Sequence, residues 1–158
     1  MDSRREISVE KMETLMPLIR ESLAAGQSVR FYPRGISMMP MLRQGVDSVL
    51  LSPITGDLQK YDIPLYQRND GKYVLHRIVG AGPSYTCMGD NQFRREPGLQ
   101  PDQMIGVVTA FYRGNREIAV TAPTYWVYCR LWHYSRPLRR FWHRGIGWLR
   151  RHLKRGNA

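Results

Sequence analysis

One serine stands out because its neighbours give it no obvious structural task. Ser37 lies within Arg34–Arg43, two residues after Gly35 and three residues before Pro40. Gly35 lacks a side chain where a second backbone segment could approach closely, and Pro40 discourages a helix running through Ser37. The pattern predicts a serine on an irregular turn lined by methionines, and therefore a candidate nucleophile. The alternative is a turn serine in a methionine-rich core loop.

A serine nucleophile needs a base, and His76 is the best placed of the 4 histidines because the other three lie in the basic C-terminal segment. A neutral imidazole is the usual base near pH 7. On a strand over residues 72–79, Val74, His76 and Ile78 would share one face. The alternative is a satisfied buried histidine. Lys72 is a rival base, but it lies about 13 Å from His76 by strand rise, so both cannot serve one hydroxyl.

A third polar group follows one short predicted strand later. Asp90 lies on a turn beside Gly89, where its carboxylate could hold the imidazole in the tautomer that a triad requires. The alternative is a turn aspartate bonded to its own backbone. The 2 cysteines, Cys87 and Cys129, form neither a disulfide framework nor a metal-ligand pattern. The sequence therefore predicts no metal or other cofactor and favours a reducing, cytoplasmic compartment.

These residues must be positioned by a mainly β domain. Apolar residues at helical spacing predict a helix over residues 8–25 that ends at Gly26. Short β-branched and aromatic runs between turn signals then predict a series of strands, with a polar loop over 92–103. We expect three parts: an N-terminal helix (1–27), a β domain (28–122) and a C-terminal tail (123–158). The predicted strands cover residues 28–33, 46–51, 61–67, 72–79, 85–88, 104–112 and 117–121.

Three boxes in the β domain occur in a familiar order. The hexapeptide Gly-Ile-Ser-Met-Met-Pro at 35–40 resembles the serine box of the signal peptidase I superfamily, which also contains the self-cleaving LexA-type repressors. The strand Tyr-Val-Leu-His-Arg-Ile-Val-Gly at 73–80 resembles that family's base-bearing strand, and Met-Gly-Asp-Asn-Gln at 88–92 resembles its later Gly-Asp-Asn box. Residues 106–108 resemble the strand that closes the family's barrel. The resemblance covers about residues 28–112.

The resemblance implies an irregular, coiled β-barrel and a serine endopeptidase. Ser37 would be the nucleophile, His76 the base and Asp90 the assisting carboxylate. An extended peptide with small residues before the cut would add to a strand edge and pass through an acyl-enzyme. The backbone N–H of Ser37 would donate to the oxyanion, with Gly35 and Met38 beside the substrate. Many bacterial members carry a hydroxyl where this chain has Gly35, so the second donor stays unassigned.

Two departures from the family pattern qualify the prediction. Family signal peptidases carry a transmembrane anchor, and this sequence contains no apolar run of about 20 residues. Self-cleaving repressors carry a DNA-binding domain, for which the residues before the serine box are too few. We therefore expect a histidine-base peptidase without such an anchor, soluble or bound peripherally to the inner face of a membrane. The alternatives are a non-catalytic peptide-binding relative docked on a membrane, and a nucleic-acid-bound regulator.

The C-terminal tail carries most of the net charge. Residues 118–158 contain 9 Lys/Arg and no Asp or Glu, whereas residues 1–117 contain 15 Lys/Arg and 13 Asp/Glu. All 4 tryptophans also lie in this tail. Aromatic rings interleaved with cations are typical of an anionic membrane interface. A helix that packs its aromatics on the domain is the next alternative, and nucleic acid binding is a weaker one.

Overall fold

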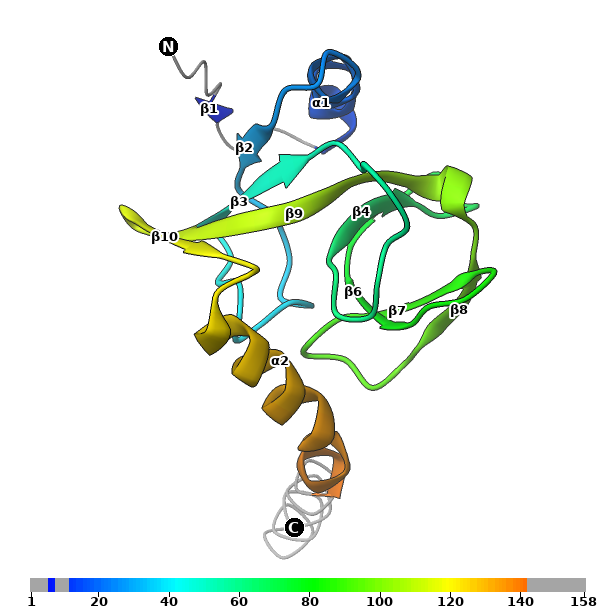
Figure 1. Ribbon diagram of the computed structural model, residues 1–158, viewed down its shortest axis with the longest axis vertical. Coiled ribbons are helices and arrows are strands. Elements are labelled where there is room, and N and C mark those ends of the chain that lie inside the picture. The colour runs from blue at the N-terminus through cyan, green and yellow to red at the C-terminus, as the bar shows by residue number, and fades with distance from the viewer. Residues whose placement is uncertain (1–5, 8–11, 142–158) are drawn as a thin grey trace, which may run out of the picture.

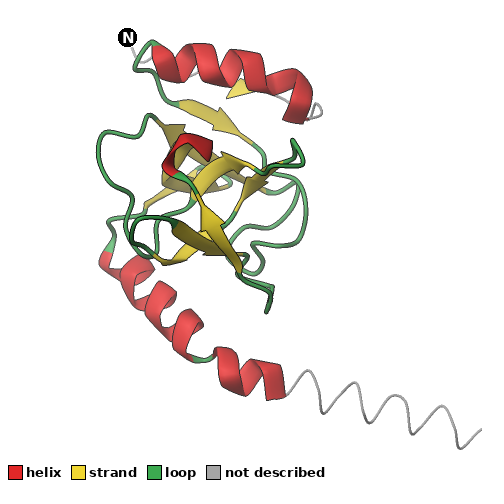
Figure 2. Cartoon of the chain, turned by 90° about the vertical axis from the view of Figure 1, so that its right-hand side faces the viewer, coloured by secondary structure: helices red, strands yellow, loops and turns green. Residues whose placement is uncertain are grey.

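The computed structural model describes residues 6–7 and 12–141 of the chain. The fold is mainly β, as predicted, with a helix at each end (Figure 1). Helix α1 (Met12–Ala24) and helix α2 (Pro123–Tyr134) lie at opposite ends of the molecule, with the strands between them (Figure 2). The predicted start of the first helix, at residues 8–11, lies outside the described residues.

The described strands form two open sheets and do not close into a barrel, so the predicted barrel is not found. The larger sheet has seven strands in the order β1-β2-β3-β9-β4-β5, with β10 also paired to β9, and the smaller has three in the order β6-β7-β8. All pairs are antiparallel except β1 and β2. The strands are β1 (Glu6–Ile7), β2 (Val29–Phe31), β3 (Asp47–Ser52), β4 (Pro64–Gln67), β5 (Tyr73–Leu75), β6 (Arg77–Gly80), β7 (Tyr85–Met88), β8 (Glu96–Leu99), β9 (Met104–Arg113) and β10 (Arg116–Ala119).

The predicted strand at 72–79 is two strands in the structure. Leu75 at the end of β5 pairs with Leu65 of the larger sheet, whereas Arg77 at the start of β6 pairs with Met88 of the smaller sheet. His76 is therefore the residue at which the chain crosses from one sheet to the other. The expectation that His76 lies within a single strand is wrong, because the residues before it pair with β4 and the residues after it pair with β7. Val74 and Ile78, which were expected to share a face with His76, do pack in one apolar cluster.

The predicted loop at 92–103 is also wrong, because it contains β8 and a short 3-10 helix at Pro101–Gln103. The loop was predicted from the polar composition of this segment and from its two prolines, Pro97 and Pro101. However, β8 is an edge strand that pairs only with β7, and an edge strand tolerates a proline that cannot donate to a ladder. This strand places Glu96, which is partly buried, beside His76.

Both helices share the core of the larger sheet. The inward face of α1 buries four apolar residues that recur at helical spacing, and α2 adds two residues to the same cluster. Burial of one such aliphatic side chain stabilises the fold by about 1.5–3 kcal/mol. Gly26 ends α1 at φ +75°, as predicted. None of the helices in the described segments has the length and apolar character needed to cross a bilayer. The core residues from the helices are Leu15, Met16, Ile19, Leu23, Tyr125 and Cys129.

Candidate active site

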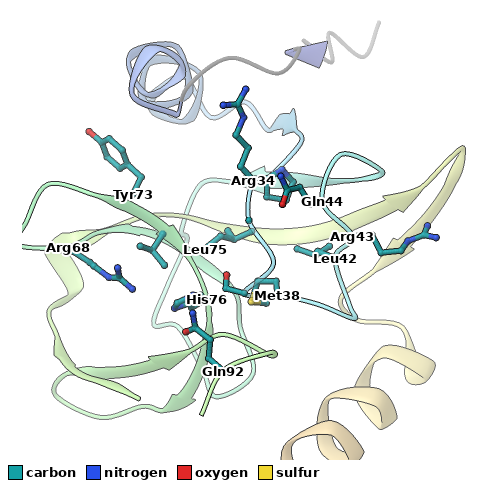
Figure 3. Close-up of a pocket in the computed structure, with 14 residues that line it drawn as sticks. Arg34, Met38, Leu42, Arg43, Gln44, Arg68, Tyr73, Leu75, His76 and Gln92 are labelled. Atoms are coloured by element: carbon teal, nitrogen blue, oxygen red, sulfur yellow. The ribbon is translucent and has the colours of Figure 1, made fainter. Parts of the chain in front are cut away.

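Ser37 and His76 line the same pocket, although they are 39 positions apart in the sequence. The pocket has a volume of about 240 Å³ and lies between the serine turn and strand β5 (Figure 3). Met38 and Leu42 contribute apolar wall, and Arg68 contributes a cation. The structure thus brings together the predicted nucleophile and the predicted base in one concave site.

The backbone at Ser37 is held by the later Gly-Asp-Asn box. The N–H of Asn91 donates to the Ser37 carbonyl oxygen over 2.8 Å, and Asn91 Nδ2 donates to the Ile36 carbonyl over 3.2 Å. A Cβ on Gly89 would lie 2.6 Å from the Ser37 carbonyl oxygen, so only glycine fits. The close approach predicted at Gly35 therefore occurs at Gly89, and Gly35 instead supplies a φ of +94° with open space around it.

The serine turn leaves its own polar groups available. Within the described part of the chain, neither the Ser37 hydroxyl nor the backbone N–H groups of Ser37 and Met38 make a hydrogen bond. Two adjacent N–H groups without partners next to a nucleophile are the kind of donors that stabilise an oxyanion. Met38 is thereby a candidate for the second donor that the sequence left unassigned.

His76 is 2% exposed and makes its polar contacts through one ring nitrogen. Its Nδ1 lies 3.2 Å from the Tyr66 hydroxyl and 3.2 Å from Oε1 of Glu96. A proton on Nδ1 then faces the carboxylate, which leaves the lone pair on Nε2. This is the tautomer in which a histidine accepts a proton from a nucleophile.

Glu96 is itself fixed by two neighbours. Arg68 donates to both carboxylate oxygens, with Nε 2.7 Å from Oε2, and the Tyr66 hydroxyl donates to Oε2 over 3.0 Å. Burial opposes the charge on Glu96, but these donors outweigh it and hold the pKa of the carboxyl below its ordinary value. Glu96 is therefore an ionised acceptor beside the imidazole.

The electrostatics of the site keep His76 neutral. Burial lowers the pKa of the imidazole below its ordinary 6.5, and the nearby charge of Arg68 acts in the same direction. The carboxylate of Glu96 opposes this shift without reversing it. A neutral imidazole near pH 7 is the form that serves as a general base.

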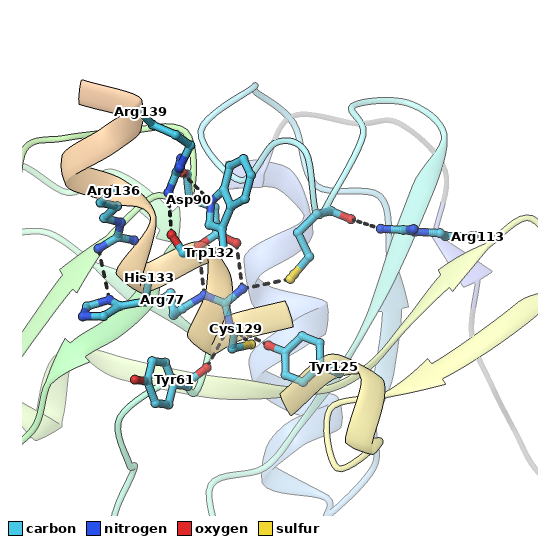
Figure 4. A network of polar contacts seen from close by, with 11 residues as sticks. Tyr61, Arg77, Asp90, Arg113, Tyr125, Cys129, Trp132, His133, Arg136 and Arg139 are labelled. Atoms are coloured by element: carbon cyan, nitrogen blue, oxygen red, sulfur yellow. Dashed lines mark hydrogen bonds and ion pairs between the residues drawn. The ribbon is translucent and has the colours of Figure 1, made fainter. Parts of the chain in front are cut away.

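Asp90, the predicted assisting carboxylate, has a different partner. Its two oxygens accept hydrogen bonds from Arg77 Nε and Nη2 over 2.8 and 2.7 Å, and both residues are at most 1% exposed (Figure 4). Trp132 of α2 donates its Nε1–H to the Asp90 backbone carbonyl over 2.9 Å. Asp90 therefore connects the Gly-Asp-Asn box, which holds Ser37, to strand β6 and to helix α2. The carboxylate that contacts His76 is Glu96.

The rival base does not enter the pocket. Lys72 is largely exposed and pairs with Asp70 over 3.3 Å, and it is absent from the pocket wall. Among the residues that the structure describes, no group of three or more His, Cys, Asp or Glu side chains is arranged to hold a metal ion.

Sequence reasoning missed Glu96, Tyr66 and Arg68. Glu96 lies in the segment interpreted as a loop, and only the pairing of β8 with β7 brings it to His76. One signal was present, because Glu96 is the only acidic residue in the stretch 92–101, but nothing in the sequence connects it to His76.

The chain was also compared with known proteins. No protein-family model matches it, and no curated protein is detectably similar to it in sequence.

Proposed function

We propose that the protein is a serine endopeptidase in which Ser37 is the nucleophile, His76 the general base and Glu96 the residue that orients His76. The observation that carries this proposal is that Ser37 and His76 line one pocket, with a carboxylate beside Nδ1 of the imidazole. Nucleophile, base and orienting acid are the three roles that recur in unrelated serine hydrolases.

The reaction would be an acyl transfer in two halves. Ser37 Oγ attacks the peptide carbonyl carbon while His76 Nε2 takes the hydroxyl proton, and the N–H groups of Ser37 and Met38 bind the developing oxyanion. The intermediate collapses to an ester on Ser37, and the imidazolium gives its proton to the departing amine. Water, deprotonated by His76, then hydrolyses the ester and restores the hydroxyl.

Strand β5 supports an extended peptide as the substrate. It is an edge strand of the larger sheet, so that one side of its backbone is unpaired within the described fold. Its residues Tyr73, Val74 and Leu75 all line the pocket. A peptide that adds to this edge by main-chain hydrogen bonds would present a carbonyl to Ser37. The open edge of β5 beside the pocket also favours an architecture like that of the signal peptidases, which we propose for this fold.

A serine-directed acylating or phosphonylating probe tests the assignment without a known substrate. Intact-mass analysis of the wild type should show one label, and peptide mapping should locate it on Ser37. Ser37→Ala should abolish the label, whereas Ser84→Ala, which removes a half-buried turn serine, should not. Unchanged labelling of Ser37→Ala, or a wild type in which Ser37 reacts no faster than Ser84, would contradict the proposal.

The open edge of β5 also favours a second candidate, a peptide-binding protein without catalysis. In that case an extended peptide would bind equally well to the wild type and to Ser37→Ala, and neither would form an acyl-enzyme. Mass spectrometry of the peptide after incubation separates the two functions, because only a peptidase produces fragments.

A further inference from the structure

Helix α2 and the helical residues 136–141 that follow it expose an apolar stripe. Backbone hydrogen bonds from Ser135 to Leu131 and from Arg139 to Ser135 continue the helical pattern across the junction. Large side chains recur at intervals of three or four residues within each helical segment, which places them on one face of that segment. We call these exposed side chains together the apolar stripe; they are Val127 47%, Leu131 67% and Tyr134 70% on α2, and Leu138 69% and Phe141 78% on residues 136–141.

The opposite face of α2 is already occupied by the protein. Tyr125 and Cys129 are buried and accept hydrogen bonds from Arg77, and Trp132 binds the Asp90 carbonyl (Figure 4). The helix is therefore fixed on the domain by one side and presents the apolar stripe on another. A contiguous exposed apolar surface of this kind indicates a docking site.

A groove of about 850 Å³ lies beside the end of the stripe, and the described residues of its wall include three arginines and no acidic residue. Arg136 is the central one, since it is only 9% exposed. Among the described residues its Nε and Nη2 have no hydrogen-bond partner, and Nη1 lies 3.5 Å from His133 Nδ1 (Figure 4). The groove wall consists of Met88, Phe93, Arg95, Arg136, Pro137, Arg140 and Phe141.

A buried guanidinium without an acceptor is unusual because its desolvation is not offset. Burial lowers the pKa of Arg136, and the positive charges of Arg139, Arg77 and Arg95 act in the same direction. Asp90 opposes them, but both of its carboxylate oxygens are engaged by Arg77. An incoming oxyanion would supply the missing acceptors, and the planar fork of a guanidinium matches phosphate oxygens well.

We propose that Arg136, assisted by Arg95 and Arg140, binds the phosphate of an anionic phospholipid while the apolar stripe lies in the acyl boundary of the membrane. The stripe and the groove share Phe141, so one membrane surface can occupy both. The charge of the tail is complementary to anionic lipid, since residues 118–158 carry 9 Lys/Arg and no acidic residue.

Nucleic acid fits this surface less well. Three of the five stripe residues, Val127, Leu131 and Leu138, are aliphatic and offer no face on which a base stacks. The two described tryptophans of α2 have a guanidinium over the ring, with Arg130 3.4 Å from the Trp126 centroid and Arg139 3.6 Å from the Trp132 centroid. Each of these rings thus already has a stacking partner.

Vesicle co-sedimentation of the full chain tests the proposal. The wild type should pellet with vesicles of phosphatidylcholine mixed with phosphatidylglycerol, and only weakly with phosphatidylcholine alone. Arg136→Met should lower the partition onto the anionic vesicles by about tenfold. The double variant Leu131→Gln/Leu138→Gln should lower it at least as much because it removes the apolar insertion. Arg20→Gln, which removes an exposed cation on α1, should stay within about twofold of the wild type.

Thermal shift separates the lipid from free phosphate and checks folding. Arg136→Met should be at least as stable as the wild type, because it removes an unpaired buried charge. A short-chain phosphatidylglycerol should raise the Tm of the wild type and not of Arg136→Met. Equal pelleting of Arg136→Met and wild type, pelleting that does not need anionic lipid, or a Tm increase with inorganic phosphate but not with the short-chain lipid would overturn the proposal. Ser37→Ala should pellet normally, so this result is independent of the peptidase proposal.

Discussion

Replacement of Asp90 by asparagine separates a structural carboxylate from a catalytic one. Asp90 accepts two hydrogen bonds from Arg77, over 2.8 and 2.7 Å, in a site that is closed to solvent. Asparagine keeps the shape but removes the charge and one acceptor. The guanidinium of Arg77, itself 1% exposed, then stays buried with only neutral partners.

The size of the effect follows from this burial. Removal of one partner from a buried, hydrogen-bonded ion pair costs about 3–5 kcal/mol, which is a large part of the roughly 5–15 kcal/mol that holds a typical domain folded. At about 2–4 °C per kcal/mol for a chain of this size, the Tm should fall by about 6–20 °C. The same variant should leave the orientation of His76 intact, since His76 contacts Glu96.

Urea denaturation and differential scanning calorimetry measure the loss of stability, and the rate of Ser37 labelling by the acylating probe measures catalysis below the new Tm. Asp70→Asn is the matched control because it breaks an exposed pair with Lys72 and should leave the Tm unchanged. If Asp90→Asn slowed labelling of the folded protein by about a hundredfold or more with little change in Tm, Asp90 would be the catalytic carboxylate and the reasoning above would be wrong.

Three further predictions concern the pocket. Glu96→Gln should slow labelling of Ser37 by about a hundredfold, because the imidazole loses its orienting partner. The acidic limb of the pH–rate profile of this variant should also move to lower pH, since Glu96 opposes the lowering of the His76 pKa. A pH–rate profile that matches the wild type would argue against the contact between Glu96 and His76. Gly89→Ala should abolish labelling, because the added Cβ would lie 2.6 Å from the Ser37 carbonyl oxygen; peptide mapping that finds Ser37 labelled at the wild-type rate would reject this close approach. The acidic loss of the wild-type labelling rate should have its midpoint below pH 6.5, because burial lowers the pKa of His76 below its ordinary 6.5. In the same acidic range the free energy of unfolding should also fall, since the unfolded chain binds a proton at His76 before the folded chain does.

The sequence predicted the parts of the site that depend on local chemistry. Gly35 and Pro40 mark an irregular turn around Ser37, and His76 is the only histidine outside the basic tail. Gly35, Ser37 and His76 line one pocket in the structure. The helix that ends at Gly26 and most strands also followed from periodicity and turn residues, because such signals are local.

The parts that failed depend on pairing between distant segments. The break of one predicted strand at His76 follows from its two neighbours, β4 and β7, which no local pattern reveals. The identity of the carboxylate that contacts His76 also depends on such pairing. Asp90 was nearer in sequence, but Arg77 is the buried cation that needs a carboxylate, and an edge strand brings Glu96 to the imidazole.

The most direct test of the central claim is the second-order rate constant for labelling of Ser37 in the wild type and in His76→Ala, measured at neutral pH by intact mass. We predict that the variant reacts at least about a hundredfold more slowly, as expected for loss of a general base. Free imidazole should partly restore its rate, because the pocket that His76 lines would have room for it. Equal rate constants for the two proteins would contradict the activation of Ser37 by His76.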